Sequence, residues 1–155
     1  MTETAKRHPI KDFSSSESGM AMVEWAMALS FFAILLMGVV ELGSAAQYKM
    51  QLSNAVRVGM QYATVRKPIQ GDLTQITASV INAAPPDATG QRTLTVSMYC
   101  QCPDGTAVDC AGSCGTEDRH SYVGIVLEDV YVPILTLPGT PDQYTLRADG
   151  TIRLN

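Results

Sequence analysis

Histidine is scarce in this chain of 155 residues, which has only His8 and His120. No second histidine or acid is spaced around His120 so as to build a catalytic triad or a metal site. A glycine-rich phosphate-binding loop is also lacking, and Asp104, Gly105 and Asp109 do not match a calcium loop. These gaps argue against an enzyme, a cofactor or a bound metal, and favour a structural or binding protein.

Positive charge is scarce in the second part of the chain. Residues 68–155 carry four Lys or Arg against ten Asp or Glu, a balance of −6, whereas residues 1–67 carry seven against five, a balance of +2. A nucleic-acid-binding surface needs a basic patch, and interleaved aromatic residues when it binds single strands. No such pattern is present, so nucleic acid is excluded as an expected partner.

One long stretch has no charge at all. The 16 residues from Trp25 to Val40 are uncharged and almost all apolar. Residues 20–43 supply the length of about 20 residues that a helix needs to cross a lipid bilayer. We therefore predict a transmembrane helix over residues 20–43, preceded by a polar cytoplasmic leader at residues 1–19.

The helical pattern continues beyond the predicted membrane span. Apolar and small residues recur at steps of three and four as far as Pro68, which ends the pattern. They are Val39, Leu42, Ala46, Met50, Ser53, Val56, Met60 and Ala63. A helix over residues 20–67 would be about 70 Å long, and only about 30 Å fits in hydrocarbon. We expect residues 44–67 to continue outside the membrane and to pack against their own domain.

Residues 68–155 read as a small α+β domain. Asp72 is placed to cap a short helix that stops before Pro85 and Pro86. A period of two then predicts strands over residues 94–100, 123–132 and 144–154. We expect an antiparallel sheet of three to four strands against the long helix.

Two details of these strands are open in the sequence. The alternation changes phase at Glu128 and Asp129, which predicts a β-bulge. Asp149 and Gly150 have the composition of a hairpin turn, but the unbroken alternation around them favours one continuous strand.

Four cysteines, Cys100, Cys102, Cys110 and Cys114, fall within 15 residues. An even number in a glycine-rich loop favours disulfides in an oxidising compartment, hence the periplasm or the cell surface. A nested pairing, Cys102–Cys110 inside Cys100–Cys114, fits a returning loop, and the crossed pairing is the alternative. A structural zinc site is a weaker reading because the spacing is not a common zinc pattern. Free thiols are the last alternative for these cysteines.

The boundary between the leader and the apolar run carries a distinctive arrangement. Gly19 and Met20 are followed by a carboxylate at Glu24 and by Trp25. A carboxylate deep in a bilayer costs about 2.5–3.5 kcal/mol on insertion scales. Cleavage after Gly19 would create an α-ammonium at Met20 that could neutralise Glu24 or its copy in a neighbouring subunit.

This arrangement resembles the processing site of type IV prepilins and, more narrowly, the TadE-like family of the tight-adherence (Flp/Tad) pilus system. Two further segments carry the resemblance, an E-L-G step and an N-A-x-R-x-G-x-x-Y-A segment. The positions that match are Glu41, Leu42, Gly43, Asn54, Arg57, Gly59 and Tyr62.

The resemblance implies a pilin-like fold and a pseudopilin processed by prepilin peptidase. The implied partners are other pilin or pseudopilin subunits and the inner-membrane pilus assembly platform. The implied role is in pilus biogenesis, adherence and biofilm formation. The implied location is the bacterial inner membrane, with one span, the N-terminus in the cytoplasm and the C-terminus in the periplasm.

Several residues also have simpler readings. Glu41 is either solvated at the membrane–water boundary or in contact with a partner subunit's cation. Trp25 is an ordinary membrane-interface aromatic unless it belongs to the assembly motif. Arg57 is by default a solvated helix charge. The small residues Gly38 and Gly43 would permit close approach of another helix.

Two other classes of protein fit the same features. The segment Ser44-Ala45-Ala46 before Gln47 is a passable signal-peptidase site, which would yield a soluble secreted domain. An uncleaved, signal-anchored periplasmic binding or scaffold protein is the other alternative, in which Glu24 would be incidental.

Overall fold

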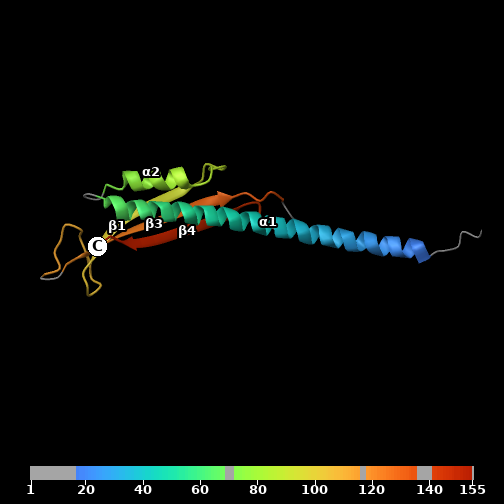
Figure 1. The fold of residues 1–155 in the computed structure, drawn as a ribbon, viewed down its shortest axis with the longest axis horizontal. Helices are drawn as coiled ribbons and strands as arrows, with labels where there is room; N and C mark the ends of the chain where they lie inside the picture. The colour runs from blue at the N-terminus through green and yellow to red at the C-terminus, as the bar shows by residue number, and fades with distance from the viewer. Residues whose placement is uncertain (1–16, 69–71, 116–117, 136–140, 155) are drawn as a thin grey trace, which may run out of the picture. The chain divides into compact units, whose positions relative to one another are not determined.

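The computed structural model describes residues 17–68, 72–115, 118–135 and 141–154. It is an α+β protein, as predicted, with one long helix, one short helix and four strands (Figure 1). The elements are α1 (Glu17–Arg66), α2 (Thr74–Ala83), β1 (Thr93–Gln101), β2 (Ala107–Val108), β3 (His120–Tyr131) and β4 (Tyr144–Arg153). The chain divides into two units, one reaching to Val39 and one from Val40 to Asn155.

The first unit contains the apolar part of α1. Its large side chains are exposed along the whole run, because no other part of the unit covers them; they include Met20, Trp25, Leu29, Phe31, Phe32, Ile34 and Leu36. By length and composition α1 is able to cross a membrane. This stretch is therefore a candidate membrane anchor.

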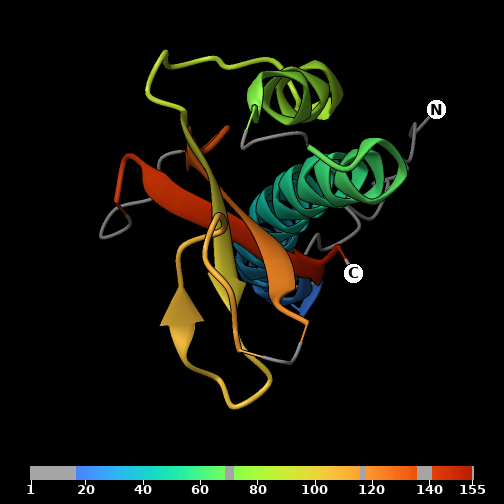
Figure 2. The same cartoon turned by 90° about the vertical axis from the view of Figure 1, so that its left-hand side faces the viewer.

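The second unit is built on one antiparallel sheet in the order β2-β1-β3-β4 (Figure 2). The register runs without interruption, with Glu128 opposite Arg147 and Asp129 opposite Leu146. The predicted bulge at this point is wrong. Gly150 pairs with Ile125 inside β4, so the prediction of one continuous strand there is confirmed.

The core lies between one face of the sheet and the two helices. It contains Leu52, Ala55, Val56 and Ala63 of α1, Ile76 and Val80 of α2, Val123, Ile125 and Leu127 of β3, and Ala148 of β4. Asp72 accepts a hydrogen bond from the backbone N–H of Thr74 at 3.0 Å, and α2 ends at Ala83, before the two prolines. The predicted stop before the prolines is confirmed. The predicted cap is wrong, because the N-cap position is Leu73, which forms no side-chain cap bond, and Asp72 lies one residue before it.

Gly59 is the point of closest approach between α1 and its neighbours. A Cβ atom there would overlap Cγ2 of Val80 and lie 2.9 Å from Cδ1 of Ile125. Both neighbours are completely buried and have little room to shift. Only glycine therefore allows α1 to pack this closely on α2 and β3.

We expect Gly59→Ala to lower the free energy of unfolding by about 1–3 kcal/mol, the usual cost of overpacking a core. This loss outweighs the higher helix propensity of alanine, which favours the variant by about 1 kcal/mol. Gly43→Ala is the matched control, because nothing lies within 4 Å of the added Cβ there. Urea unfolding in detergent measures both, and equal stability of the two variants would contradict the packing argument.

Candidate functional site

The predicted processing and assembly residues lie on the first turns of α1. Gly19 and Met20 are helical, and Met20, Glu24 and Trp25 are exposed. Within the described part of the chain, no hydrogen bond or ion pair is formed by the Glu24 carboxylate. Among the described residues, this carboxylate beside the uncharged run of α1 therefore has no partner.

Glu41, the acid at the other end of the apolar run, is held by its own domain. Its Oε1 accepts a hydrogen bond from the Tyr131 hydroxyl at 3.1 Å. Its Oε2 accepts from the backbone N–H groups of Ile134 at 3.1 Å and Leu135 at 3.2 Å. Glu41 is partly exposed, and its described partners are a hydroxyl at the end of β3 and two backbone N–H groups of the following loop, not a cation.

Two further polar residues continue this line along α1. Ser44 and Tyr48 follow Glu41 at steps of three and four, so all three share one face of the helix. The Ser44 hydroxyl is 2.7 Å from the Tyr131 hydroxyl, and the Tyr48 hydroxyl donates to Asp129 Oδ2 at 2.9 Å. The rings of Tyr48 and Tyr131 are 5.6 Å apart between centroids. This row fixes the end of β3 against the helix.

Asp129 is the buried charge at the centre of this contact, with 1% of its surface exposed. Arg92, just before β1, donates to Asp129 Oδ2 from Nε at 2.8 Å and from Nη2 at 2.5 Å. Burial and the neighbouring Asp129 carboxylate together raise the pKa of Tyr48. A tyrosine is already protonated at neutral pH, and this shift keeps the Tyr48 hydroxyl a donor to more alkaline pH.

The sequence did not predict the cluster of Asp129, Arg92, Tyr48 and Tyr131. The one feature that could have indicated it is the position of Asp129 in the strand. Asp129 occupies an inward position of β3, in phase with Val123, Ile125 and Leu127, and was read as a break in the pattern.

The other motif residues differ in burial. Gly59 is required for packing, and Tyr62 packs at the edge of the core. Leu42 and Arg57 are exposed, as is Asn54. The motif thus combines residues that fix the fold with residues that remain free to meet another molecule.

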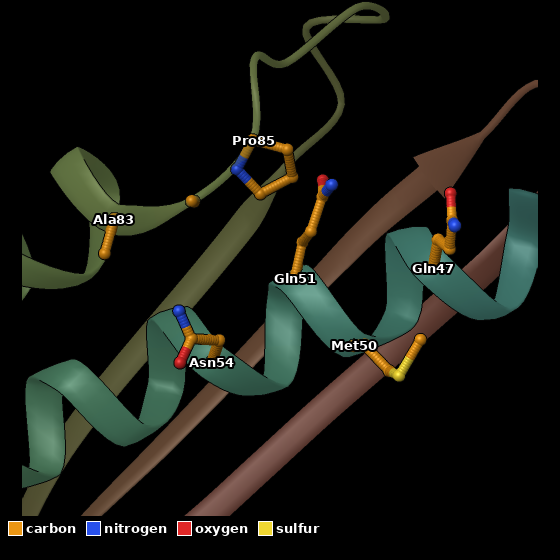
Figure 3. Close-up of a pocket in the computed structure, with 7 residues that line it drawn as sticks. Gln47, Met50, Gln51, Asn54, Ala83 and Pro85 are labelled. Carbon is orange, nitrogen blue, oxygen red and sulfur yellow. The ribbon is translucent and has the colours of Figure 1, made fainter.

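Asn54 lines a groove between α1 and the end of α2 (Figure 3). The groove has a volume of about 520 Å³. Gln47, Gln51 and Asn54 stand along its α1 side, and Ala83, Ala84 and Pro85 face them. It offers amide groups but no charged or nucleophilic side chain.

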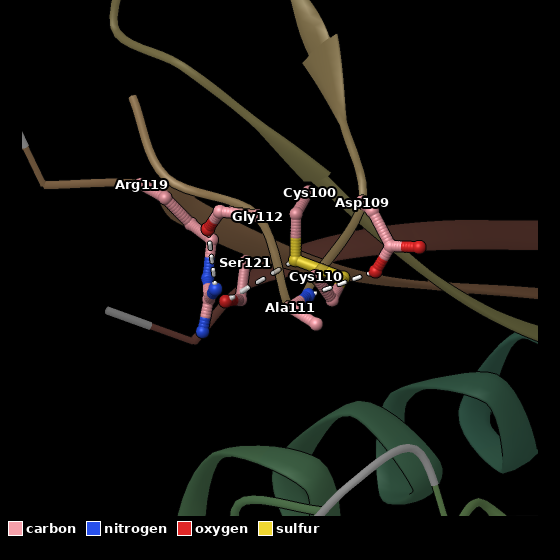
Figure 4. Close-up of a disulfide and its surroundings, with 7 residues drawn as sticks. All are labelled: Cys100, Asp109, Cys110, Ala111, Gly112, Arg119 and Ser121. Atoms are coloured by element: carbon pink, nitrogen blue, oxygen red, sulfur yellow. Dashed lines mark hydrogen bonds between the residues drawn. A yellow bond between two sulfur atoms is a disulfide. The ribbon is translucent and has the colours of Figure 1, made fainter. Parts of the chain in front are cut away.

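The four cysteines form two disulfides, Cys100–Cys110 and Cys102–Cys114, with Cα–Cα distances of 5.2 and 5.5 Å. Figure 4 shows the first of them. The pairing is crossed, so the nested pattern is wrong and the alternative is confirmed. Strand pairing explains the crossed pattern. Cys100 is buried, and the turn between β1 and β2 brings Val108 opposite Cys100. Cys110, two residues after Val108, therefore lies beside Cys100.

We expect removal of Cys102–Cys114 by a double alanine substitution to lower the free energy of unfolding by about 2–3 kcal/mol. The same change at Cys100–Cys110 should cost more, because Cys100 is 1% exposed and its sulfur also fills space in the core. Urea unfolding of both variants in detergent tests this order, and a reversed order would contradict it.

The described residues contain no group of three or more His, Cys, Asp or Glu placed to hold a metal ion. His120 lies instead in a hollow at the disulfide end of the sheet, with Arg119, Arg153 and Asp118.

Comparison with known proteins gives one family. The model of TadE-like proteins matches residues 19–61, which run from the predicted processing glycine to the residue before Tyr62. The resemblance seen in the sequence is confirmed over this segment. No curated protein and no solved structure matches the chain.

Proposed function

We propose that this chain, whose residues 19–61 are TadE-like, is a pseudopilin of a Tad (Flp) pilus assembly and secretion apparatus. The family match carries the proposal, because it begins at Gly19 and includes Glu24 and Glu41. It covers the candidate membrane anchor and the part of α1 that packs on the domain.

The proposed mechanism begins with processing. Prepilin peptidase cuts between Gly19 and Met20 on the cytoplasmic side of the inner membrane, which leaves a positive α-ammonium on Met20. The Glu24 carboxylate then pairs with an N-terminal ammonium during assembly with other pilin or pseudopilin subunits on the assembly platform. Burying either charge alone costs several kcal/mol, so the register that pairs them is favoured.

In this proposal the second unit faces the periplasm. Two disulfides fit an oxidising compartment, and the acidic balance of residues 68–155 suits a solvated domain. There the domain supports pilus biogenesis and, through the pilus, adherence and biofilm formation.

A signal-peptidase cut before Gln47 is disfavoured by the contacts of the domain. It would remove Glu41 and Ser44, which bond to Tyr131 and to the loop after β3. The domain would lose these contacts at the start of its own helix. An uncleaved anchor keeps them, so it differs from the proposal only at Gly19.

The test is the N-terminal sequence and intact mass of the membrane-extracted protein, expressed with and without prepilin peptidase. The proposal expects a start at Met20 that depends on the peptidase. A start at Gln47 would identify a secreted domain. An unprocessed N-terminus in the presence of active peptidase would leave a signal-anchored protein and overturn the pseudopilin assignment.

A further inference from the structure

The loop after β3 presents apolar side chains next to Glu41. Val132 is 47% and Ile134 is 70% exposed, and beside Glu41 on the helix Val40 is 58% and Leu42 is 75% exposed. We call these four residues the apolar rim. The hydrogen bonds from Ile134 and Leu135 to Glu41 bring the loop and the helix turn together. The rim therefore consists of exposed apolar side chains from two distant parts of the sequence at one turn of α1, with Val40 and Leu42 on different sides of the helix.

The length of the uncharged run indicates how deep in the bilayer the apolar rim lies. The 16 residues from Trp25 to Val40 span about 24 Å of helix, whereas the hydrocarbon core is about 30 Å thick. With Glu24 at or inside one boundary, an upright helix places Glu41, 17 residues further on, close to the opposite hydrocarbon boundary. The rim lies at the same level.

A carboxylate at that depth needs hydrogen-bond donors from the protein. Glu41 has three, the Tyr131 hydroxyl and the N–H groups of Ile134 and Leu135. The donors come from a sequence that carries no charge between Asp129 and Asp142. The loop thus satisfies the carboxylate and adds apolar side chains at the same depth.

We propose that the segment Val132–Leu135 is a lipid-contacting loop that seats the domain on the bilayer, and that Glu41 is its positioning residue. This rests on the proposed membrane anchoring of α1. The bilayer is the occupant because the rim continues the membrane-length apolar run of the same helix. Its uncharged surroundings match a lipid interface, where an exposed apolar patch is stable.

The test uses the full chain in phosphatidylcholine–phosphatidylglycerol vesicles with phosphatidylcholine brominated near the headgroup end of its acyl chains. Trp25 is the single tryptophan, so the wild type reports on the anchor. In a Trp25→Phe background, Ile134→Trp reports on the loop. Val65→Trp is the matched control, because Val65 is 81% exposed and lies about 36 Å beyond Glu41 along α1, away from the bilayer.

We expect at least a twofold loss of fluorescence for the wild type and for I134W, and little loss for V65W. Adding Glu41→Ala to the I134W protein should restore most of its fluorescence. The E41A variant that keeps Trp25 should still be quenched at Trp25. If Trp25 is quenched but I134W is no more quenched than V65W, the lipid contact is overturned and the anchor stands.

Quenching of I134W that appears only at very low protein-to-lipid ratio, while Trp25 is quenched at every ratio, would assign the rim to another subunit and overturn the proposal. Unchanged quenching in the E41A variant would overturn the positioning role of Glu41. Absence of Trp25 quenching would remove the anchor itself, and with it the proposed function.

Discussion

Replacing Arg92 with alanine is expected to lower the free energy of unfolding by about 3–5 kcal/mol, the usual cost of breaking a buried ion pair. The Asp129 side chain is fully buried, and the Arg92 side chain is 10% exposed. Removing Arg92 leaves the carboxylate in the core with the Tyr48 hydroxyl and the backbone N–H of Val130 as its remaining described donors. The variant should unfold at much lower urea concentration in detergent.

Two controls separate this effect from a general loss of charge. Arg147→Ala removes a cation of the same domain that pairs with Glu128 at 3.3 Å but is 57% exposed, so its loss should cost less than about 1 kcal/mol. The double variant Arg92→Met with Asp129→Leu removes both buried charges. It should recover most of the stability that R92A loses, because apolar residues of similar volume can replace a buried ion pair. Equal losses for R92A and R147A would contradict the argument.

The same residues show what the sequence could and could not predict. Hydrophobic periodicity identified both helices and all three long strands, because these elements bury apolar side chains at regular steps. It failed at Asp129, where the buried residue is charged. A period rule cannot recognise an inward carboxylate unless its distant partners, Arg92 and Tyr48, are known. The strand continues, and the apparent bulge is a polar contact inside the core.

The cysteines and Glu41 show a related limit. Four cysteines in a short loop predicted disulfides, but the crossed pairing depends on the β1–β2 register, which brings Val108 opposite Cys100. Glu41 was identified from the family motif, and its partners lie about 90 residues away, at the end of β3 and in the loop after it, where the sequence has no motif. Long-range pairing is the information that local patterns lack.

Glu24→Ala is expected to abolish assembly while membrane insertion is retained. The substitution removes a carboxylate from an apolar helix, so insertion becomes easier. The proposed assembly contact would then leave the Met20 ammonium of a neighbouring subunit unpaired in hydrocarbon, at a cost of about 2.5–3.5 kcal/mol. This corresponds to a loss on the order of a hundredfold in the assembly equilibrium. Pilus yield and crosslinking to pilin subunits measure it.

Val23→Ala is the matched control, because Val23 is also exposed on α1 and its loss changes no charge. It should insert and assemble like the wild type. Glu24→Asp keeps the charge on a shorter side chain and should retain part of the assembly. Since the cut at Gly19 precedes assembly, E24A must also be shown to start at Met20, so that a processing defect is not read as a pairing defect. A correctly processed E24A protein with normal pilus yield and normal crosslinking would mean that Glu24 does not pair with a neighbouring ammonium.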